Sequence, residues 1–445
     1  SELHVVHCKL KNSMQQYEVY QAISGTDTSQ IQFQINPPIG GCTLKGKSLI
    51  MKLPLTIVVK NLLGNWATAV TPFTKHTYGL AQFPFARVME DLTVLINGKH
   101  EFNYAPSVYH HALKTYTKLD DPKIQQEFAM PDLFSRFQAY TGTSSYNSNY
   151  PLAAHGTTTG FMSRASHFIK SAFFIDDNGV ETSSPTTRAV VEFVVTMPIP
   201  MDIFKRDIHN ITSINITCEM MSKDKFIYMY NSDGANASQY ASSLFDFQFR
   251  TGRYPSPECT ALWEFPNDSF GYPVQRYRNK RYEFFTIPDP NHVTFIDYER
   301  RVSSDLFSFG KASKMYVYAK LDQYATATAS TYFKTYLTSA FGVVRKFSLM
   351  LNNQAYFEHY DENMIWEMCE RNGYFHSFMN AHGGSLAANG YSTGAGTVVC
   401  VDFSKDVKPE ETNVARVTLE YDLSTSISSY NSVFIVLEYD EEVEF

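Results

Sequence analysis

The side chains of this 445-residue sequence that could carry chemistry are scattered histidines, carboxylates and cysteines. His110 and His111 stand side by side in a segment that we expect to be helical. Neighbouring residues on a helix point in different directions, so the pair would make a poor joint metal site. His359 lies among acidic residues in Glu358–Glu362, which follows an expected strand. Acidic groups favour the first turn of a helix, so this stretch indicates a helix start rather than an acid–base pair.

Motifs that mark catalytic or cofactor-binding sites are missing. The sequence has no HExxH, no GxSxG, no P-loop and no GxGxxG after a strand. His376 and His382 lie close to the pair Gly383-Gly384 and are expected in a loop. The six cysteines have irregular spacing without a CxxC pair, which indicates reduced, mostly buried thiols rather than a zinc site or a disulfide framework. We therefore predict no catalytic, cofactor-binding or metal-binding residues, and we do not expect an enzyme.

One dense basic cluster, Arg276–Tyr282, alternates with aromatic residues. Such a pattern could stack on nucleic acid. A strand whose charged face meets an acidic neighbour is the favoured interpretation, and Glu299–Arg301 is interpreted in the same way. The net charge is −7 and the sequence ends in the acidic stretch Glu438–Phe445, so we expect no sequence-specific nucleic-acid binding.

The elements that would position these residues are mostly strands. Aromatic residues make up 15% of the chain, and they favour strands over helices. Charged residues make up 19%, below the share of about 25% in ordinary soluble domains. No apolar run is long enough to predict a transmembrane segment. Helices are expected only near 105–116 and 361–371. Pro54 interrupts the expected strand Ser48–Val59 and indicates an edge position or a bulge there. The expected strands are Gln30–Ile35, Ser48–Val59, Asp91–Ile96, Ala189–Met197, Ser213–Cys218, Leu244–Phe249, Lys314–Leu321, Lys346–Leu351, Thr397–Phe403, Ala415–Tyr421 and Val433–Tyr439.

These elements repeat. Leu92 and Phe347 begin equivalent stretches 255 residues apart, each a strand, an Asn-containing turn and a helix. The three late strands of each half are matched in order, so that 244–249 corresponds to 433–439. We predict a duplicated all-β domain, with residues 1–252 as the first unit and 253–445 as the second, divided in the linker-like segment 250–257. The first unit also carries an N-terminal arm and a long surface insertion near 117–187, rich in Ser, Thr, Gly and Tyr.

Several stretches, in this order, resemble the double jelly-roll major capsid proteins of virophages and polinton-like viruses. The resemblance extends over roughly residues 30 to 445. It is carried by Phe33–Pro38 with its Asn-Pro-Pro, Leu49–Val59, Phe83–Gly98, Gly342–Gln354, Glu367–Gly373 and Val401–Val407.

The resemblance implies two tandem eight-stranded jelly-roll β-sandwiches with short helices and long loop insertions. It further implies a virion protein, made and assembled inside the host cell, that forms homotrimers as pseudo-hexameric capsomers of an icosahedral shell. The implied partners are further copies of the chain and penton or minor capsid proteins. Two alternatives stay open: a minor capsid or fibre protein, and a two-jelly-roll carbohydrate-active or sugar-binding protein.

Overall fold

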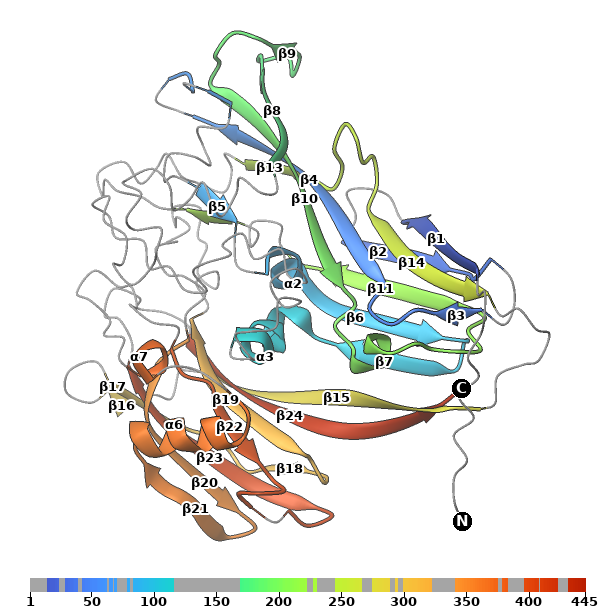
Figure 1. Cartoon of the computed structure of the whole chain (residues 1–445). Helices are drawn as coiled ribbons and strands as arrows, with labels where there is room; N and C mark the ends of the chain where they lie inside the picture. Colours follow the sequence, from blue (N-terminus) through green and yellow to red (C-terminus); the bar gives the residue numbers. More distant parts are fainter. Residues whose placement is uncertain are drawn as a thin grey trace.

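The computed structural model describes the chain in segments. They are residues 14–23, 29–38, 42–61, 64–66, 68–69, 78–80, 83–115, 169–221, 227–229, 245–265, 274–288, 293–294, 299–321, 341–374, 378–382, 396–407, 409–422 and 431–445. All strand pairs in these segments are antiparallel, and they form two β-sandwiches (Figure 1).

The first sandwich consists of two sheets. One has the strand order β1-β14-β4-β10-β8-β9, with β13 and β3 at its sides, and the other has the order β2-β11-β6-β7. The strands of the first sheet are β1 (Met14–Gln21), β14 (Glu258–Phe265), β4 (Ile50–Lys60), β10 (Arg188–Pro198), β8 (Ile169–Ile175), β9 (Glu181–Thr182), β13 (Phe245–Gln248) and β3 (Thr43–Leu44). Those of the second are β2 (Gln30–Ile35), β11 (Ile214–Met220), β6 (Met89–Ile96) and β7 (His100–Tyr104), and a separate short pair joins β5 (Tyr78–Leu80) to β12 (Ile227–Met229).

The second sandwich repeats this plan. Its sheets have the orders β15-β24-β19-β22 and β16-β17-β23-β20-β21, with β18 beside β23. The strands are β15 (Arg276–Pro288), β24 (Asn431–Glu444), β19 (Lys314–Leu321), β22 (Val399–Asp402), β16 (Val293–Thr294), β17 (Glu299–Ser303), β23 (Asn413–Asp422), β20 (Val343–Leu351), β21 (Gln354–Tyr360) and β18 (Phe307–Phe309).

Short helices connect the strands. Both predicted helices are confirmed: the first is a π-turn η1 followed by α3, and the second is α6. The helical elements are α2 (Pro84–Val88), η1 (Pro106–His110), α3 (His111–Thr115), η3 (Asp202–Lys205, a 3-10 turn), α6 (Glu362–Arg371) and α7 (Phe378–Ala381). Among the described residues no helix has both the length and the apolar character needed to cross a bilayer.

The same strand order in both halves is that of a jelly-roll. In each half the first strand pairs with the last, the last with the third, and the third with the sixth, while the second, seventh, fourth and fifth form the facing sheet. Side chains that alternate inward build the core between the two sheets, as in β11 and β6. The predicted pair of tandem jelly-rolls is therefore confirmed as the fold.

One strand match from the sequence is wrong. The equivalent of β24 is β14, because both lie between the first and third strands of their sheets, whereas residues 245–248 form the extra strand β13 beside β4. Segment 250–257 is thus a turn between β13 and β14, closed by a hydrogen bond from Thr251 N to Tyr254 O at 2.8 Å. By sheet membership β14 belongs with the first half, so we propose a boundary after Phe265 instead of at 252/253.

Pro54 lies in a central strand rather than at an outer edge. One side of β4 pairs with β10 along its whole length. On the other side, β14 pairs with residues 50–52 and β13 with residues 56–59, so Pro54 falls in the interval between these two partners. The missing N–H of proline is tolerated because the ladder is interrupted there.

Candidate functional site

His110 and His111 are both buried but do not converge on one point. The Nδ1 atom of His110 lies 3.0 Å from the Tyr104 hydroxyl, and its ring meets Phe83 edge-on at 5.4 Å. The ring of His111 instead stacks on Phe341 at 4.7 Å. Complete burial, helped by the positive charge of Lys114, holds the pKa of His110 well below its usual value, so this ring stays neutral. The two histidines are packing residues.

The acidic stretch Glu358–Glu362 starts a helix only at its end: Glu358 and His359 lie in β21, and Asp361 and Glu362 begin α6. Asp361 caps α6 through a hydrogen bond from Met364 N to its Oδ1 at 3.0 Å, and Glu362 occupies the first turn with Arg345 as its ion-pair partner. His382 was expected in a loop, but it lies buried at the end of α7, with Nδ1 3.2 Å from Val344 O. His376 lies outside the described residues.

Five of the six cysteines lie in the described segments, and all five are buried thiols. Cys369 Sγ accepts a hydrogen bond from Cys400 N at 3.3 Å, and burial raises the pKa of the Cys369 thiol to about 12. A thiol that stays protonated is a poor nucleophile and a poor metal ligand. In the same segments His, Cys, Asp and Glu side chains form no group of three that could hold a metal ion.

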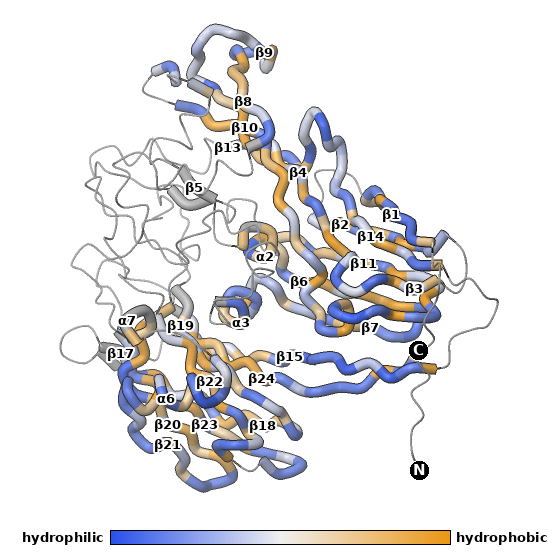
Figure 2. The backbone as a smooth tube through the Cα atoms, viewed as in Figure 1, coloured by the Kyte–Doolittle hydropathy of each residue, from blue (hydrophilic) through white to orange (hydrophobic). Residues whose placement is uncertain are grey.

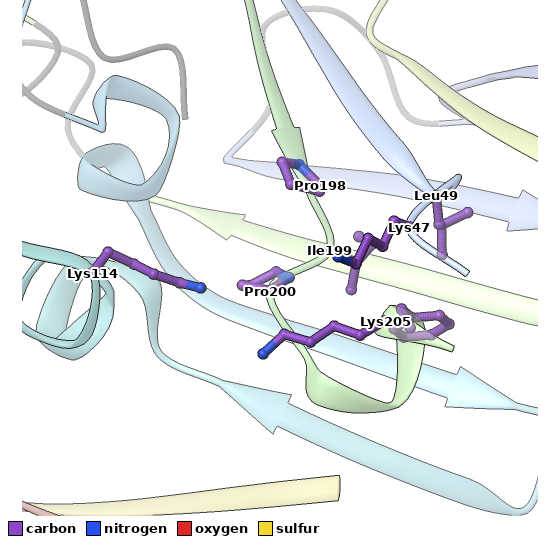
Figure 3. A pocket seen from close by; sticks show the side chains of 8 residues that line it. Lys47, Leu49, Lys114, Pro198, Ile199, Pro200 and Lys205 are labelled. Carbon is purple, nitrogen blue, oxygen red and sulfur yellow. The ribbon is translucent and has the colours of Figure 1, made fainter. Parts of the chain in front are cut away.

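A small pocket opens beside the turn after β10 (Figure 3). Its volume is about 20 Å³ and its lining includes Lys47, Lys114 and Lys205 together with Pro198–Pro200. Lys205 forms an ion pair with Asp202 at 2.5 Å. A space of this size holds about one water molecule, so the pocket is not suited to a substrate.

The basic cluster of the sequence meets the acidic one. Strand β15 pairs with β24 residue by residue, which sets Arg276–Tyr282 beside Glu438–Glu444 and produces a hydrophilic end of both strands (Figure 2). Arg276 lies 2.5 Å from Glu444 and Arg281 lies 2.7 Å from Glu441. The expected strand with an acidic neighbour is confirmed. The same holds for Arg301 of β17, whose Nε is 3.9 Å from Glu420 of β23.

The best-defined polar and aromatic cluster lies at the junction between the two sandwiches. Strand β7, the π-turn η1 and the 3-10 turn η3 of the first sandwich rest against β15 of the second (Figure 1). Tyr109 contacts Tyr282 with ring centroids 5.1 Å apart, and Tyr104 meets the same ring edge-on at 5.9 Å. His111 reaches Phe341 across this junction.

Hydrogen bonds between the two sandwiches add to the ring contacts and set the orientation of one sandwich relative to the other. The Tyr318 hydroxyl donates to Val108 O at 2.8 Å, and the Tyr374 hydroxyl donates to Ala112 O. Nearer to Phe445, His209 N donates to the Tyr277 hydroxyl at 3.0 Å. Burial, reinforced by neighbouring carboxylates and phenols, raises the pKa of Tyr104 and Tyr282 well above the usual value, so both hydroxyls stay protonated.

Sequence reasoning did not find this junction. Its members are far apart in the sequence, with separations from 68 residues for His209 and Tyr277 to 262 residues for Ala112 and Tyr374. An aromatic residue in a strand looks the same in the sequence whether it fills a core or joins two domains. What the junction can do is mechanical, because it holds two sandwiches at one fixed orientation without a catalytic group among them.

The fold can be compared with solved structures. No family model matches the chain, and no curated protein matches it in sequence. A chain of the Sputnik virophage structure determined by cryo-electron microscopy aligns over 98% of this chain and 87% of its own, with a TM-score of 0.77 and 17% identity. The mavirus major capsid protein aligns over 96% of this chain and 90% of its own, with a TM-score of 0.66 and 13% identity. The chain therefore has a double jelly-roll fold, and it shares that fold over nearly its whole length with the mavirus major capsid protein.

Proposed function

We propose that this protein is a viral major capsid protein, a structural subunit of the virion shell and not an enzyme. The observation that carries the proposal is the rigid pairing of two complete jelly-rolls in one chain, in the fold of the mavirus major capsid protein. Such a pair gives each subunit two domains of the same fold, which suits a closed assembly made of repeated contacts.

The assembly unit in this proposal is a homotrimer. Three chains would supply six sandwiches and so a pseudo-hexagonal tile, and tiles would pack into an icosahedral shell that encloses the genome. Penton or minor capsid proteins would complete the shell. Each contact can be modest, because many contacts act together in a shell.

The alternatives receive less support. A minor capsid or fibre protein would usually have one jelly-roll, and this chain has two. A carbohydrate-active or sugar-binding protein would offer a cleft with paired carboxylates or stacked tryptophans. Trp263 is instead fully buried, and its indole N–H donates a hydrogen bond to the Tyr20 hydroxyl. Trp66 is also buried, and its indole N–H donates to Val59 O. Trp366 of α6 is half-buried and packs edge-on against Phe378.

Light scattering during size-exclusion chromatography, followed by electron microscopy of the same sample, tests the proposal. We expect a species with three times the mass of the chain, and tiles or shells with pseudo-hexagonal outlines. A protein that stays monomeric at high concentration and forms no such tiles would overturn it.

A further inference from the structure

The second sandwich extends a two-stranded ribbon beyond its own sheets. Strand β24 pairs with β19 over residues 431–438, and in the described sheets residues 439–444 pair with β15 alone. Two backbone hydrogen bonds between Gln275 and Phe445, both at 3.1 Å, close the ribbon. We call residues 275–281 and 439–445 the ribbon end, which lies beneath β7 of the first sandwich (Figure 1). A two-stranded ribbon is only marginally stable by itself, so the ribbon end depends on the surface against which it packs.

The ribbon end contacts the first sandwich through two aromatic side chains. Tyr277 is 5% exposed, and its hydroxyl accepts the hydrogen bond from His209 N. The Phe445 ring lies 5.4 Å from the Tyr277 ring and 4.8 Å from the ring of His100 in β7. The aromatic cluster around Tyr282 is about 17 Å further along β15, at about 3.3 Å per residue. The ribbon therefore contacts the first sandwich in two separate zones.

The ribbon end is bound more firmly to itself than to the first sandwich. Asn279 lies on the same face of β15 as Tyr277 and is 4% exposed, and its Oδ1 has no hydrogen-bond partner among the described residues. A buried acceptor without a partner costs free energy, which hydration recovers. Ion pairs within the ribbon instead join its two strands, Arg276 to Glu444 and Arg281 to Glu441. The ribbon end can therefore leave the first sandwich as one unit.

His209 lies under the ribbon end in a charged environment. Its side chain is half-buried, with Nδ1 2.7 Å from Thr43 Oγ1. Three charged groups and one phenol face it: Asp207 in its own loop, Lys45 after β3, Glu264 of β14 and Tyr277 of β15. Lys45 forms ion pairs with both of these carboxylates. Burial lowers the pKa of His209 below its usual value, and Lys45 adds to this shift while the two carboxylates oppose it.

We propose that the ribbon end is an acid-sensitive latch, seated on the first sandwich at neutral pH and released in acid, with the aromatic cluster around Tyr282 as the hinge. Release hydrates both His209 and Asn279. The hydrated imidazole has a pKa near 6.5 and the seated one a lower value, so proton uptake below about pH 6.5 favours release. The latch is therefore fully seated at pH 7.5. Its release frees the angle between the two sandwiches, a property of the single chain that does not depend on the capsid proposal.

Hydrogen–deuterium exchange with mass spectrometry tests the latch, because the His209 N–H donates to the ribbon end. Protection factors are compared at pH 7.5 and pH 5.5 after correction for the pH dependence of the intrinsic exchange rate. We expect the peptide 207–213 to lose protection several-fold at pH 5.5, while a peptide from the core strand β10 keeps its protection. Equal protection of 207–213 at the two pH values would overturn the latch.

Histidine variants test which group takes up the proton. His209→Gln should give the same protection of 207–213 at both pH values, because glutamine does not titrate. His100→Gln changes the other histidine near the ribbon end and should keep the decrease in acid. A decrease that persists in His209→Gln, or one that only His100→Gln removes, would overturn the role of His209.

Ribbon variants test the seat and the hinge. Phe445→Ala should lower the protection of 207–213 several-fold at pH 7.5 and leave that of 108–112, in the hinge, unchanged. Asn279→Val removes the unpaired oxygen and should reduce the loss of protection at pH 5.5. Arg278→Gln is the matched control on the same strand, since Arg278 is 80% exposed, and should change neither peptide.

Two results with these variants would overturn the proposal. One is a Phe445→Ala variant in which 207–213 stays as protected as in the wild type, or in which both peptides lose protection together. The other is an Asn279→Val variant that is less protected in acid than the wild type. Circular dichroism checks that every variant is folded. Because exchange is read within one chain, failure of the latch would leave the capsid proposal standing.

Discussion

Lys280 and Glu438 bring opposite charges into the face of the second sandwich that meets the first. The Glu438 side chain is only 3% exposed, and it accepts hydrogen bonds from Lys280 Nζ and from the Tyr316 hydroxyl, the latter at 3.1 Å. Burial alone would lower the pKa of Lys280, but the Glu438 carboxylate outweighs it and raises that pKa above its usual value.

Replacement of Lys280 by Met should therefore destabilise the fold, because it leaves the buried carboxylate without its cation. We expect a loss of about 2–3 kcal/mol in the free energy of unfolding, measured by urea denaturation. Arg278→Met is the matched control on the same strand, since Arg278 is 80% exposed and 3.9 Å from Glu442. Its loss should stay within about 0.5 kcal/mol. Equal losses for the two variants would contradict this account of the pair.

Acid should weaken the packing around His110. Its pKa in the folded protein is far below the value near 6.5 that it has in the unfolded chain, so the unfolded chain takes up a proton first as the pH falls. The free energy of unfolding should be constant near pH 7–8 and should decrease below about pH 6.5. His110→Gln should flatten this decrease, and parallel pH profiles for the variant and the wild type would exclude the role of His110.

At the scale of elements, the repeat extends to the turns between the fourth and fifth strands. Asn97 and Asn352 both have positive φ angles, of 53° and 50°. Asn97 Oδ1 accepts from Thr212 N at 2.7 Å, and Asn352 Oδ1 accepts from Val414 N at 2.9 Å. In both sandwiches one asparagine therefore shapes the hairpin and ties it to the residues at the start of the seventh strand.

Asn97→Ala should remove the hydrogen bonds that Asn97 Oδ1 accepts and should also strain the backbone at this position. We expect a loss of about 1–2 kcal/mol in the free energy of unfolding, because the half-buried acceptor and the favourable left-handed conformation are both lost. Asn97→Gly keeps the backbone relaxed and should recover part of the loss, while Asn97→Asp keeps the acceptor. If Gly and Ala were equally harmful, the side-chain bonds alone would account for the effect. Thermal unfolding of the three variants provides the comparison.

Elements with strong local patterns could be predicted from the sequence, and those that depend on distant partners could not. The alternation in Gln30–Ile35 and the Asn-Gly turn at 97–98 have their cause within a few residues. By contrast, β13 and β14 both alternate, and only the β14 pairing with β1, more than 230 residues earlier, shows which one completes the jelly-roll. The aromatic junction was missed for the same reason, since Tyr109 and Tyr282 acquire their role from each other.

At the scale of the whole molecule, the junction should make the two sandwiches unfold together. Tyr109 is 1% exposed and joins the ring of Tyr104 to that of Tyr282. We expect one calorimetric transition for the wild type and two for Tyr109→Ala, with a loss of about 3 kcal/mol. Phe33→Ala removes a ring from the core of the first sandwich alone and serves as the control. This control should lower the stability of the first sandwich but should still give one calorimetric transition. Two transitions in the wild type would refute the coupling.

The placement of the last strand of each sandwich has a consequence for synthesis. Strands β14 and β24 each lie between the first and third strands of their sheet, so neither sheet can close until its last strand has left the ribosome. Until then the growing chain exposes two apolar strand edges per sandwich, a state that favours aggregation and engagement of chaperones. The first sandwich can close once Phe265 has left the ribosome, well before the second sandwich is complete. The chain therefore has a built-in order of folding, in which the second sandwich packs against a first sandwich that is already folded.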